Sequence, residues 1–544
     1  MAGRGGGGDQ GGDRAAGAAG AVDLEMAVQS HQDKDKGAAG RRSGVPYEEA
    51  IALVGHGRFH FGLLLVCGGC ITATICELLG VGYLLPAAQC DLEMTDADKG
   101  LLGSMAFIGM LFGSHLWGFL ADTTGRRSVV LLTLFVDTAI AVLAALVPVY
   151  WMFLVLRFLA GFFVTAPQAV GYAYLGEFHS PATRAKAFVW AAVFPAIGLI
   201  FLPGVGWWVL PMTWSLELPW MAAHSWRLYV ILCAVPSLVT ALGMCALPES
   251  PKYLLSQGRA DDALAVLRRV YSANTGRPPE EFPVDSLAPP TDHTAGHAAG
   301  ADPKSIAAVM RSVWNQTAPL FTLEHALSTF LALFIMFGII AGANGLPTWL
   351  PELFNRMAMF ESTHEGRSAS VCASIEGLLG PAANGSDTAA ACEAVVETDV
   401  FVNNLYVGVA GVIAPVLSVF LVGPLGKRSL LILSLLLTGA CGLGLQFVDS
   451  SLGFLILACI VCAVTEMCIS LFSSIAVDMF PTHLRAMAVS LSLMFGRLGS
   501  IVGNLMFGSL LESACPATFY ALGGVLLACG AFSFALPRQG KFQH

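Results

Sequence analysis

The stretch Gly118-Phe-Leu-Ala-Asp122-Thr-Thr-Gly125-Arg126-Arg127-Ser128 follows a long apolar segment, and its end recurs as Gly426-Lys427-Arg428-Ser429, 301 positions later. Both copies are short polar loops between two apolar runs. The glycine allows a tight turn where a Cβ would obstruct the chain. The repetition predicts that the second part of the chain duplicates the first.

A second pattern repeats at the same offset. Glu177 precedes Arg184 by seven positions, and Asp478 precedes Arg485 by seven. Because two separate patterns share one offset, we expect a duplicated six-helix unit, with both copies in the same orientation since six is even.

The composition is that of a membrane protein. Of the 544 residues, 55% are hydrophobic and 12% are charged, and the mean hydropathy is +0.68. An average soluble domain has about 25% charged residues, so the soluble class is excluded. The net charge of -9 and the pI near 5.7 give no basic surface, which excludes nucleic acid as a partner.

Apolar runs predict the number of membrane crossings. A helix needs roughly 20 apolar residues to cross the hydrocarbon core. The sequence contains twelve such runs, at residues 61–86, 99–121, 128–149, 150–176, 186–210, 227–247, 325–350, 401–423, 428–447, 452–476, 486–510 and 516–537. The expected fold class is an all-α membrane protein of twelve transmembrane helices in two six-helix bundles (6+6). Little chain is left for a catalytic domain, so we expect no enzyme.

Basic residues predict the orientation. With a cytoplasmic N-terminus, 23 of the 29 Lys and Arg residues fall on the cytoplasmic side. Both termini are therefore expected in the cytoplasm. The predicted parts are a disordered N-terminus (1–45), the first bundle (46–247), a cytoplasmic linker (248–322), the second bundle (323–537) and a cytoplasmic tail (538–544). The second bundle includes an outer loop at 351–400.

The linker and the outer loop carry local signals. Between Asp261 and Tyr271, apolar residues recur at helical spacing and predict a short amphipathic helix against the bundle, with a stripe of Ala263, Leu264, Leu267, Val270 and Tyr271. Residues 272–302 are rich in Pro, Ala and Gly and are expected to be flexible.

The outer loop contains the sequon Asn384-Gly385-Ser386, which predicts glycosylation at Asn384, although a chance sequon is the alternative. Cys372 and Cys392 flank it on either side, and in an oxidising compartment they either form a disulfide or remain free thiols.

The residues resemble a known family. Gly118 to Arg127 resembles the loop signature of the major facilitator superfamily, and Arg157-Phe-Leu-Ala-Gly161 resembles its fourth-helix motif. Pro248-Glu249-Ser250-Pro251-Lys252 is similar to the sugar-porter and organic-ion branch. Within that branch, residues 45–100 most resemble the synaptic vesicle glycoprotein 2 family and synaptic vesicle 2-related protein. The resemblance implies the major facilitator fold over about residues 45–537.

The same resemblance implies a secondary active transporter of a small organic solute, such as an organic ion, that works by alternating access, with or without proton coupling. The family has an Asp and a Glu three apart in its first helix, whereas this chain has Thr74 and Glu77. Its outer loop is also far shorter than the lumenal domain of the vesicle glycoproteins. The shorter loop argues against the partner binding attributed to that domain. The resemblance and the missing acid at Thr74 keep an alternative open, a non-transporting synaptic-vesicle-type membrane glycoprotein that regulates vesicle traffic. The membrane is the plasma membrane or a synaptic or secretory vesicle membrane.

Ionisable residues inside the membrane are functional candidates because burying a charge there costs a few kcal/mol. Glu77 and Arg157 lie at similar depth in the first and fourth helices, so an acid that loses its arginine partner could take up a proton. A structural ion pair is the alternative. Glu466, in the tenth helix, is a further candidate for substrate or ion contact.

Charges at the cytoplasmic ends of the helices predict an inner gate. By resemblance, these residues form a network that is closed when the transporter faces outward: Asp122, Arg126, Arg127, Glu177, Arg184, Lys427, Arg428, Asp478 and Arg485. Simple positive-inside charges would not explain the acidic members, because acids contribute little to orientation.

Other apparent motifs carry no prediction of chemistry. Cys67-Gly-Gly-Cys70 and Cys459-Ile-Val-Cys462 lie in apolar runs without further ligand pairs, so we expect no metal site. No phosphate-binding loop of the form GxxxxGK[ST] is present, which argues against an ATP-driven pump. The expected partners are the lipid bilayer, a small organic substrate and protons if coupling occurs. No cofactor is expected, and the sequence identifies no protein partner.

Overall fold

The computed structural model describes residues 42–289, 314, 317–364, 368–379 and 396–536. Within these residues, twelve helical segments are long and apolar enough to cross a membrane, and each overlaps one of the predicted runs: Arg58–Ala88, Asp96–Thr124, Arg126–Ala145, Tyr150–Glu177, Pro181–Val209, Ser225–Ala246, Ala326–Thr363, Thr398–Ser418, Lys427–Phe447, Ser451–Met479, Met487–Leu510 and Cys515–Ser533. The predicted twelve-helix fold class is confirmed.

The first six spans form one half of the molecule, called the N-half. Its helices are α3 (Arg58–Ala88), α4 (Asp96–Thr124), α5 (Arg126–Ala145), α6 (Tyr150–Glu177), α7 (Pro181–Ala191), α8 (Phe194–Val209), α9 (Ser225–Cys233) and α10 (Val235–Ala246). The fifth span consists of α7 and α8, and the sixth of α9 and α10. Between α8 and α9, an antiparallel hairpin of β1 (Leu216–Leu218) and β2 (Met221–Ala223) pairs Leu216 with Ala223. This hairpin is a small exception to the all-α prediction.

The last six spans form the C-half. Its helices are α14 (Ala326–Thr363), α15 (Val371–Leu379), α16 (Thr398–Leu425), α17 (Lys427–Gly444), α18 (Ser451–Met479), α19 (Thr482–Leu510) and α20 (Cys515–Ser533). The predicted outer loop was to begin at residue 351, but α14 continues to Thr363 through Pro347 and Pro351. This extension is important because it carries two buried charges described below.

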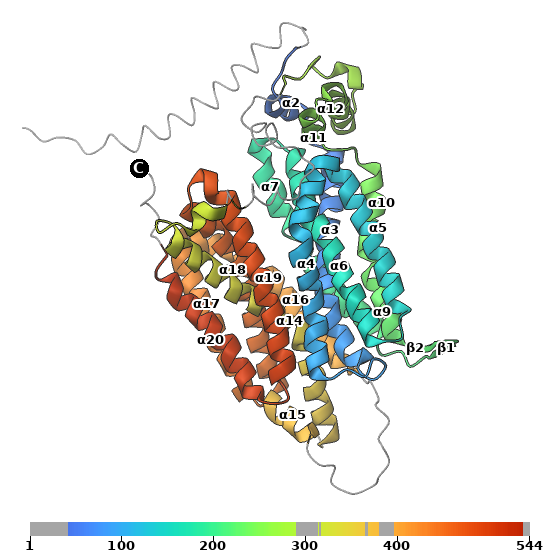
Figure 1. Cartoon of the computed structure of the whole chain (residues 1–544), viewed down its shortest axis with the longest axis vertical. Coiled ribbons are helices and arrows are strands. Elements are labelled where there is room, and N and C mark those ends of the chain that lie inside the picture. Colours follow the sequence, from blue (N-terminus) through green and yellow to red (C-terminus); the bar gives the residue numbers. More distant parts are fainter. Residues whose placement is uncertain (1–41, 290–313, 315–316, 365–367, 380–395, 537–544) are drawn as a thin grey trace, which may run out of the picture.

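The two ends of the molecule differ (Figure 1). The inner face is the end that carries α2 (Tyr47–Leu53), α11 (Pro251–Ser256) and α12 (Ala260–Thr275), whereas α15 and the β1–β2 hairpin lie toward the outer face. The ribbons of the two halves lie side by side in the outer part and diverge toward the inner face.

The first part of the linker, residues 248–289, is more ordered than its composition predicted, whereas residues 290–302 of the expected flexible stretch lie outside the described residues. The stripe of α12 is buried as expected: Ala263, Leu264, Leu267, Val270 and Tyr271. Residues 272–289, expected to be flexible, contribute Phe282, Val284 and Leu287 to the same core. Arg42 and Val45, expected in a disordered terminus, form parallel bridges with Val284 and Leu287. Burial of these three apolar side chains and the backbone hydrogen bonds to residues 42–45 favour an ordered conformation of this Pro-containing segment.

Local sequence fixes where key helices begin. Thr95 and Asp98 form a capping box at the start of α4, which places Asp96 and Lys99 in its first two turns at the outer face. At the inner face, Gly125 and Gly426 precede α5 and α17 with φ of 108° and 76°, a conformation that L side chains rarely adopt. The repeated loops thus turn as their glycines predicted.

Candidate functional site

A charged pair lies inside the N-half. Glu77 of α3 and Arg157 of α6 are buried, and an Arg157 Nη1 to Glu77 Oε1 ion pair joins them. Arg157 Nη2 also donates to the Glu77 backbone carbonyl, with an N···O distance of 2.6 Å. The structure therefore brings together the two residues that similar helix depth had paired.

A second acid stands near this pair. Asp137 of α5 is 1% exposed, accepts a hydrogen bond from Ser237 at 2.7 Å and interacts electrostatically with both Glu77 and Arg157. Within the described residues, Asp137 Oδ1 and Arg157 Nε are buried without a hydrogen-bond partner. Thr74 does not replace the missing acid, because its hydroxyl donates to the Cys70 carbonyl one turn back. Arg157 thus pairs with Glu77 and lies near a second buried acid, so one proton would neutralise the excess charge of the three groups.

The C-half presents two further charges within its spans. Glu466 of α18 is half-buried and forms no hydrogen bond or ion pair with the described residues. Arg497 of α19 donates to the Met110 carbonyl of α4 at 3.3 Å, which links the C-half to the N-half. An acid without a protein partner inside a span is a candidate for contact with a solute or an ion.

The largest charge cluster lies at the outer face and joins the halves. We call it the outer cluster: Asp96, Lys99, Glu352, Arg356 and Glu512. Lys99 Nζ of α4 lies 2.6 Å from Glu352 Oε1 of α14 and 3.2 Å from Asp96 Oδ1. Lys99, Asp96 and Glu352 are at most 4% exposed.

Arg356 closes the outer cluster from the C-half. Its guanidinium pairs with Glu352 at 2.8 Å and with Asp96 at 2.5 Å, and it lies 3.8 Å from the more exposed Glu512. Burial and the neighbouring Asp96 raise the pKa of Glu512 above its ordinary value. Sequence reasoning missed this cluster because it placed Glu352 and Arg356 in a loop. Asp96 and Lys99 are three residues apart, and Glu352 and Arg356 are four apart. These helical spacings of opposite charges were the sequence signal that could have indicated the ion pairs.

Backbone contacts reinforce the outer cluster. A Cβ on Gly100 of α4 would lie 2.8 Å from the Cα of Gly508 of α19, and one on Gly82 of α3 would lie 2.3 Å from the Thr348 carbonyl oxygen of α14. Glycine at these positions lets backbones of opposite halves touch. The outer ends of the halves are therefore closed against each other.

The predicted gate residues lie at the inner face, and those of the N-half bind one another. Arg126 pairs with Asp122 at 2.9 Å and with Glu177 at 3.1 Å. The Arg127 backbone N–H donates to Glu249 at 3.0 Å. Arg184 donates to the Gly176 carbonyl at 3.0 Å.

The gate residues of the C-half are likewise joined within their own half. Lys427 pairs with Asp478 at 3.2 Å, and Arg428 donates to the carbonyls of Ser533 and Phe534. Arg485 Nε is buried and has no hydrogen-bond partner among the described residues. The ion pairs Arg126–Glu177 and Lys427–Asp478 occupy corresponding places in the two copies of the repeat.

Within the part of the chain that the structure describes, hydrogen bonds between the halves lie between the outer face and the middle of α4. Along α4 they involve Asp96, Lys99 and Ser104 in its outer half and Met110 at its midpoint. Closer to the inner face, the described residues show no hydrogen bond or ion pair between the halves. This conformation is closed outside, with inner-face charges that do not bridge the halves.

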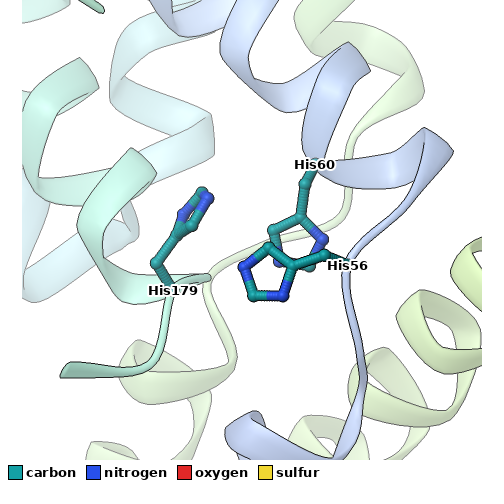
Figure 2. Close-up of side chains that lie close together, drawn as sticks. All are labelled: His56, His60 and His179. Atoms are coloured by element: carbon teal, nitrogen blue, oxygen red, sulfur yellow. The ribbon is translucent and has the colours of Figure 1, made fainter. Parts of the chain in front are cut away.

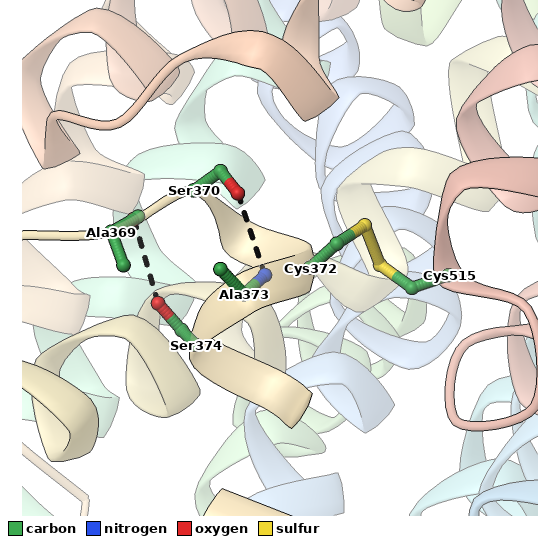
Figure 3. The surroundings of a disulfide bond; sticks show 6 residues. All are labelled: Ala369, Ser370, Cys372, Ala373, Ser374 and Cys515. Atoms are coloured by element: carbon green, nitrogen blue, oxygen red, sulfur yellow. Dashed lines mark hydrogen bonds between the residues drawn. A yellow bond between two sulfur atoms is a disulfide. The ribbon is translucent and has the colours of Figure 1, made fainter. Parts of the chain in front are cut away.

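The structure shows neither of the two alternatives left open for Cys372, a disulfide with Cys392 or a free thiol. Cys372 of α15 bonds to Cys515, the first residue of α20, and not to Cys392 (Figure 3). α15 begins at Val371 and packs at the outer face near the start of α20, so two residues 143 positions apart meet. Cys392 and the glycosylation candidate Asn384 lie outside the described residues.

Comparison with known families and proteins identifies relatives. The sequence profile described as Sugar (and other) transporter matches residues 44–288, and that of the Major Facilitator Superfamily matches residues 399–542. Synaptic vesicle glycoprotein 2A of Bos taurus is 30% identical over 326 residues, which is 57% of this chain and 44% of that protein. Synaptic vesicle glycoprotein 2C of Mus musculus is 29% identical over 324 residues, 57% of this chain and 45% of that protein. The match thus spans less than half the length of these relatives.

Solved structures share the fold. The inward open conformation of the xylose transporter XylE from E. coli gives a TM-score of 0.63 at 15% identity, covering 89% of this chain and 97% of that one. A crystal structure of a D-xylose-proton symporter gives 0.59 at 16% identity, covering 89% and 98%. At such low identity the likeness establishes the fold.

Proposed function

We propose that this chain, which belongs to the major facilitator superfamily, is a secondary transporter that moves a small organic solute across a membrane by alternating access. The family and the fold are those of transporters and not of enzymes. The chain is a multi-pass membrane protein. We further propose that both termini are cytoplasmic and that the membrane is the plasma membrane or a synaptic or secretory vesicle membrane.

One observation carries the proposal: among the described residues, hydrogen bonds and ion pairs between the halves lie between the outer face and the middle of α4, and none lies nearer the inner face. Alternating access requires two states in which contacts between the bundles form on opposite sides. The outer cluster supplies the contacts of one state, because Lys99 and Glu352 come from different halves. The gate residues are candidates for the contacts of the other state. Their charged side chains now pair within one half, and in that state they would pair with residues of the opposite half.

Three buried charged residues, Glu77, Asp137 and Arg157, support coupling of transport to protons. Glu77 and Asp137 are both buried near this single guanidinium, so the group carries one excess negative charge when both acids are ionised. Burying an uncompensated charge is costly, and uptake of one proton removes that cost. We propose that Glu77 and Arg157 couple proton binding to the change of state.

Glu466 suggests the class of solute. Its carboxylate has no hydrogen-bond or ion-pair partner among the described residues, and a positively charged group on a solute would supply one. We therefore propose that organic cations are the first class to test, with Glu466 as a contact residue. Organic anions and sugars complete the comparison.

The test is uptake of radiolabelled organic cations, organic anions and sugars into proteoliposomes that contain the full chain, with and without an imposed pH gradient. We expect saturable uptake of at least one solute, driven by the gradient. Glu77→Gln should abolish the effect of the gradient, and Glu466→Gln should raise KM. The matched control is Glu49→Gln, which removes an exposed acid at the inner face and should change neither property.

Each remaining outcome counts against a part of the proposal. Saturable uptake with the same gradient dependence in Glu77→Gln would refute the coupling role. Absence of uptake for every solute, from protein shown to be folded and inserted, would refute transport. That result would support the alternative, a non-transporting membrane glycoprotein that regulates vesicle traffic.

A further inference from the structure

Three histidines meet at the inner face of the N-half, although the sequence predicted no metal site (Figure 2). His56 lies in the loop between α2 and α3, His60 in the first turn of α3, and His179 in the turn between α6 and α7. One ring nitrogen of each lies within 4.8 Å of one from each of the others. His60 and His179 are buried, whereas His56 is exposed.

The hydrogen bonds of the two buried rings fix which nitrogens carry protons. His179 Nδ1 lies 2.9 Å from the Leu175 carbonyl, and His60 Nε2 lies 3.0 Å from the Phe178 carbonyl. A carbonyl can only accept, so each of these nitrogens carries the hydrogen. The other nitrogen, Nε2 of His179 and Nδ1 of His60, therefore keeps its lone pair. Metal-binding histidines are typically oriented in this way, with the second N–H donated to a carbonyl.

The lone pair of His60 can be released without leaving a buried donor unpaired. The Asn274 amide nitrogen of α12 lies 3.1 Å from His60 Nδ1, and also 3.2 Å from the carbonyls of Val54 and Gly55. It has two hydrogens for these three acceptors. The Phe59 N–H fixes the orientation of the amide by donating to its oxygen at 3.2 Å. Both hydrogens can thus stay paired with the carbonyls when a cation takes His60.

We propose that His56, His60 and His179 form a binding site for one Zn²⁺ ion at the inner face of the N-half. Three neutral imidazoles are a known zinc ligand set, and water can fill the fourth position because His56 faces solvent. Zinc binding requires Zn–N distances of about 2.0–2.1 Å, so the nitrogens must draw closer than 4.8 Å. The exposed His56 loop makes that movement.

The site would join elements that flank the gate residues. His179 accepts a hydrogen bond from Arg184 through its carbonyl at 3.3 Å, and Arg184 lies 3.6 Å from Glu48 of α2. A bound ion would therefore hold the α2–α3 loop, the start of α3 and the α6–α7 turn together. Ligand binding that favours the folded state raises thermal stability.

The test is zinc titration by calorimetry of the full chain in detergent, purified without a polyhistidine tag and stripped of metal with EDTA. We expect one ion bound per chain and a rise in Tm on addition of Zn²⁺. His56→Ala, which alters an exposed side chain, should weaken binding at least tenfold and remove the rise in Tm. His179→Ala should do the same. His364→Ala, which removes an exposed histidine at the outer face, is the matched control and should bind as the wild type does.

Cobalt provides a second readout of the ligands. Co²⁺ bound by three imidazoles should give visible absorption bands that disappear in His56→Ala and persist in His364→Ala. Absence of one-to-one binding in the wild type would overturn the proposal. Binding in His56→Ala and His179→Ala as strong as in the wild type would also overturn it, because the ion would then be held elsewhere, for instance by cysteine thiols.

Discussion

Lys99→Met should open the outer face of the molecule. The Lys99 ammonium is fully buried and lies 2.6 Å from Glu352, a residue of the opposite half. Removing one partner from a buried ion pair costs about 3–5 kcal/mol. Arg356 still pairs with Glu352 after the substitution, so we expect the lower end, about 3 kcal/mol, or roughly 100-fold in the equilibrium between closed and open outer faces. The cost falls on the closed state because only that state joins the two residues.

The assay is a distance measurement by pulsed EPR between spin-labelled noncanonical residues at Ala97 of α4 and Glu376 of α15. Both positions are exposed and lie in opposite halves, and the native cysteines stay unlabelled. Lys99→Met should shift the population toward longer distances. Arg259→Met, which breaks an exposed ion pair at the start of α12 away from the gate residues, is the control and should leave the distribution unchanged.

A double variant sharpens this test. In Lys99→Met combined with Glu352→Leu, the buried charge pair is replaced by apolar side chains, a change that is often neutral or stabilising. The short distance should therefore return. A distance distribution that is unchanged by Lys99→Met in folded protein would refute the role of the outer cluster.

Three further predictions concern the same end of the molecule. Gly508→Ala should favour the open outer face about tenfold, because its Cβ would lie 2.6 Å from backbone atoms of α4, whereas Gly118→Ala, in open space, should have no effect on the same EPR distance. The closed outer face raises the pKa of Glu512, so protonated Glu512 stabilises the closed state. This stabilisation is full below the ordinary glutamate pKa and is lost as the outer pH rises through the raised pKa. Glu512→Gln should therefore flatten the pH dependence of the distance above the ordinary glutamate pKa. Non-reducing peptide mapping should recover Cys372 linked to Cys515, and Cys515→Ser should lower Tm; recovery of any other partner of Cys372 would contradict the assignment.

Much of the fold was predictable because its signals are local. Twelve apolar runs and the repeated Gly125 and Gly426 loops define the spans and the duplication, and the apolar stripe of α12 is buried as its spacing predicts. The end of α14 was not predictable by the same means. Pro351 and the charged residues after it read as a loop, but neighbouring helices bury them and the helix continues.

The candidate site was predictable only in part. Similar depth in two helices suggested Glu77 with Arg157, and the structure joins them. The Lys99–Glu352 pair spans 253 positions and two halves, so nothing in the sequence around either residue indicates the other. The histidines at 56 and 179 meet for the same reason, through packing of a loop against a turn. Such contacts depend on how the helices pack and not on local periodicity.

Counterflow in proteoliposomes tests alternating access most directly. Vesicles loaded with an unlabelled solute that the protein takes up receive a trace of the labelled solute outside. A carrier whose site faces one side at a time predicts a transient accumulation of label above its equilibrium level, which Lys99→Met should diminish. Flux of label without this overshoot, or no flux in folded protein, would contradict alternating access.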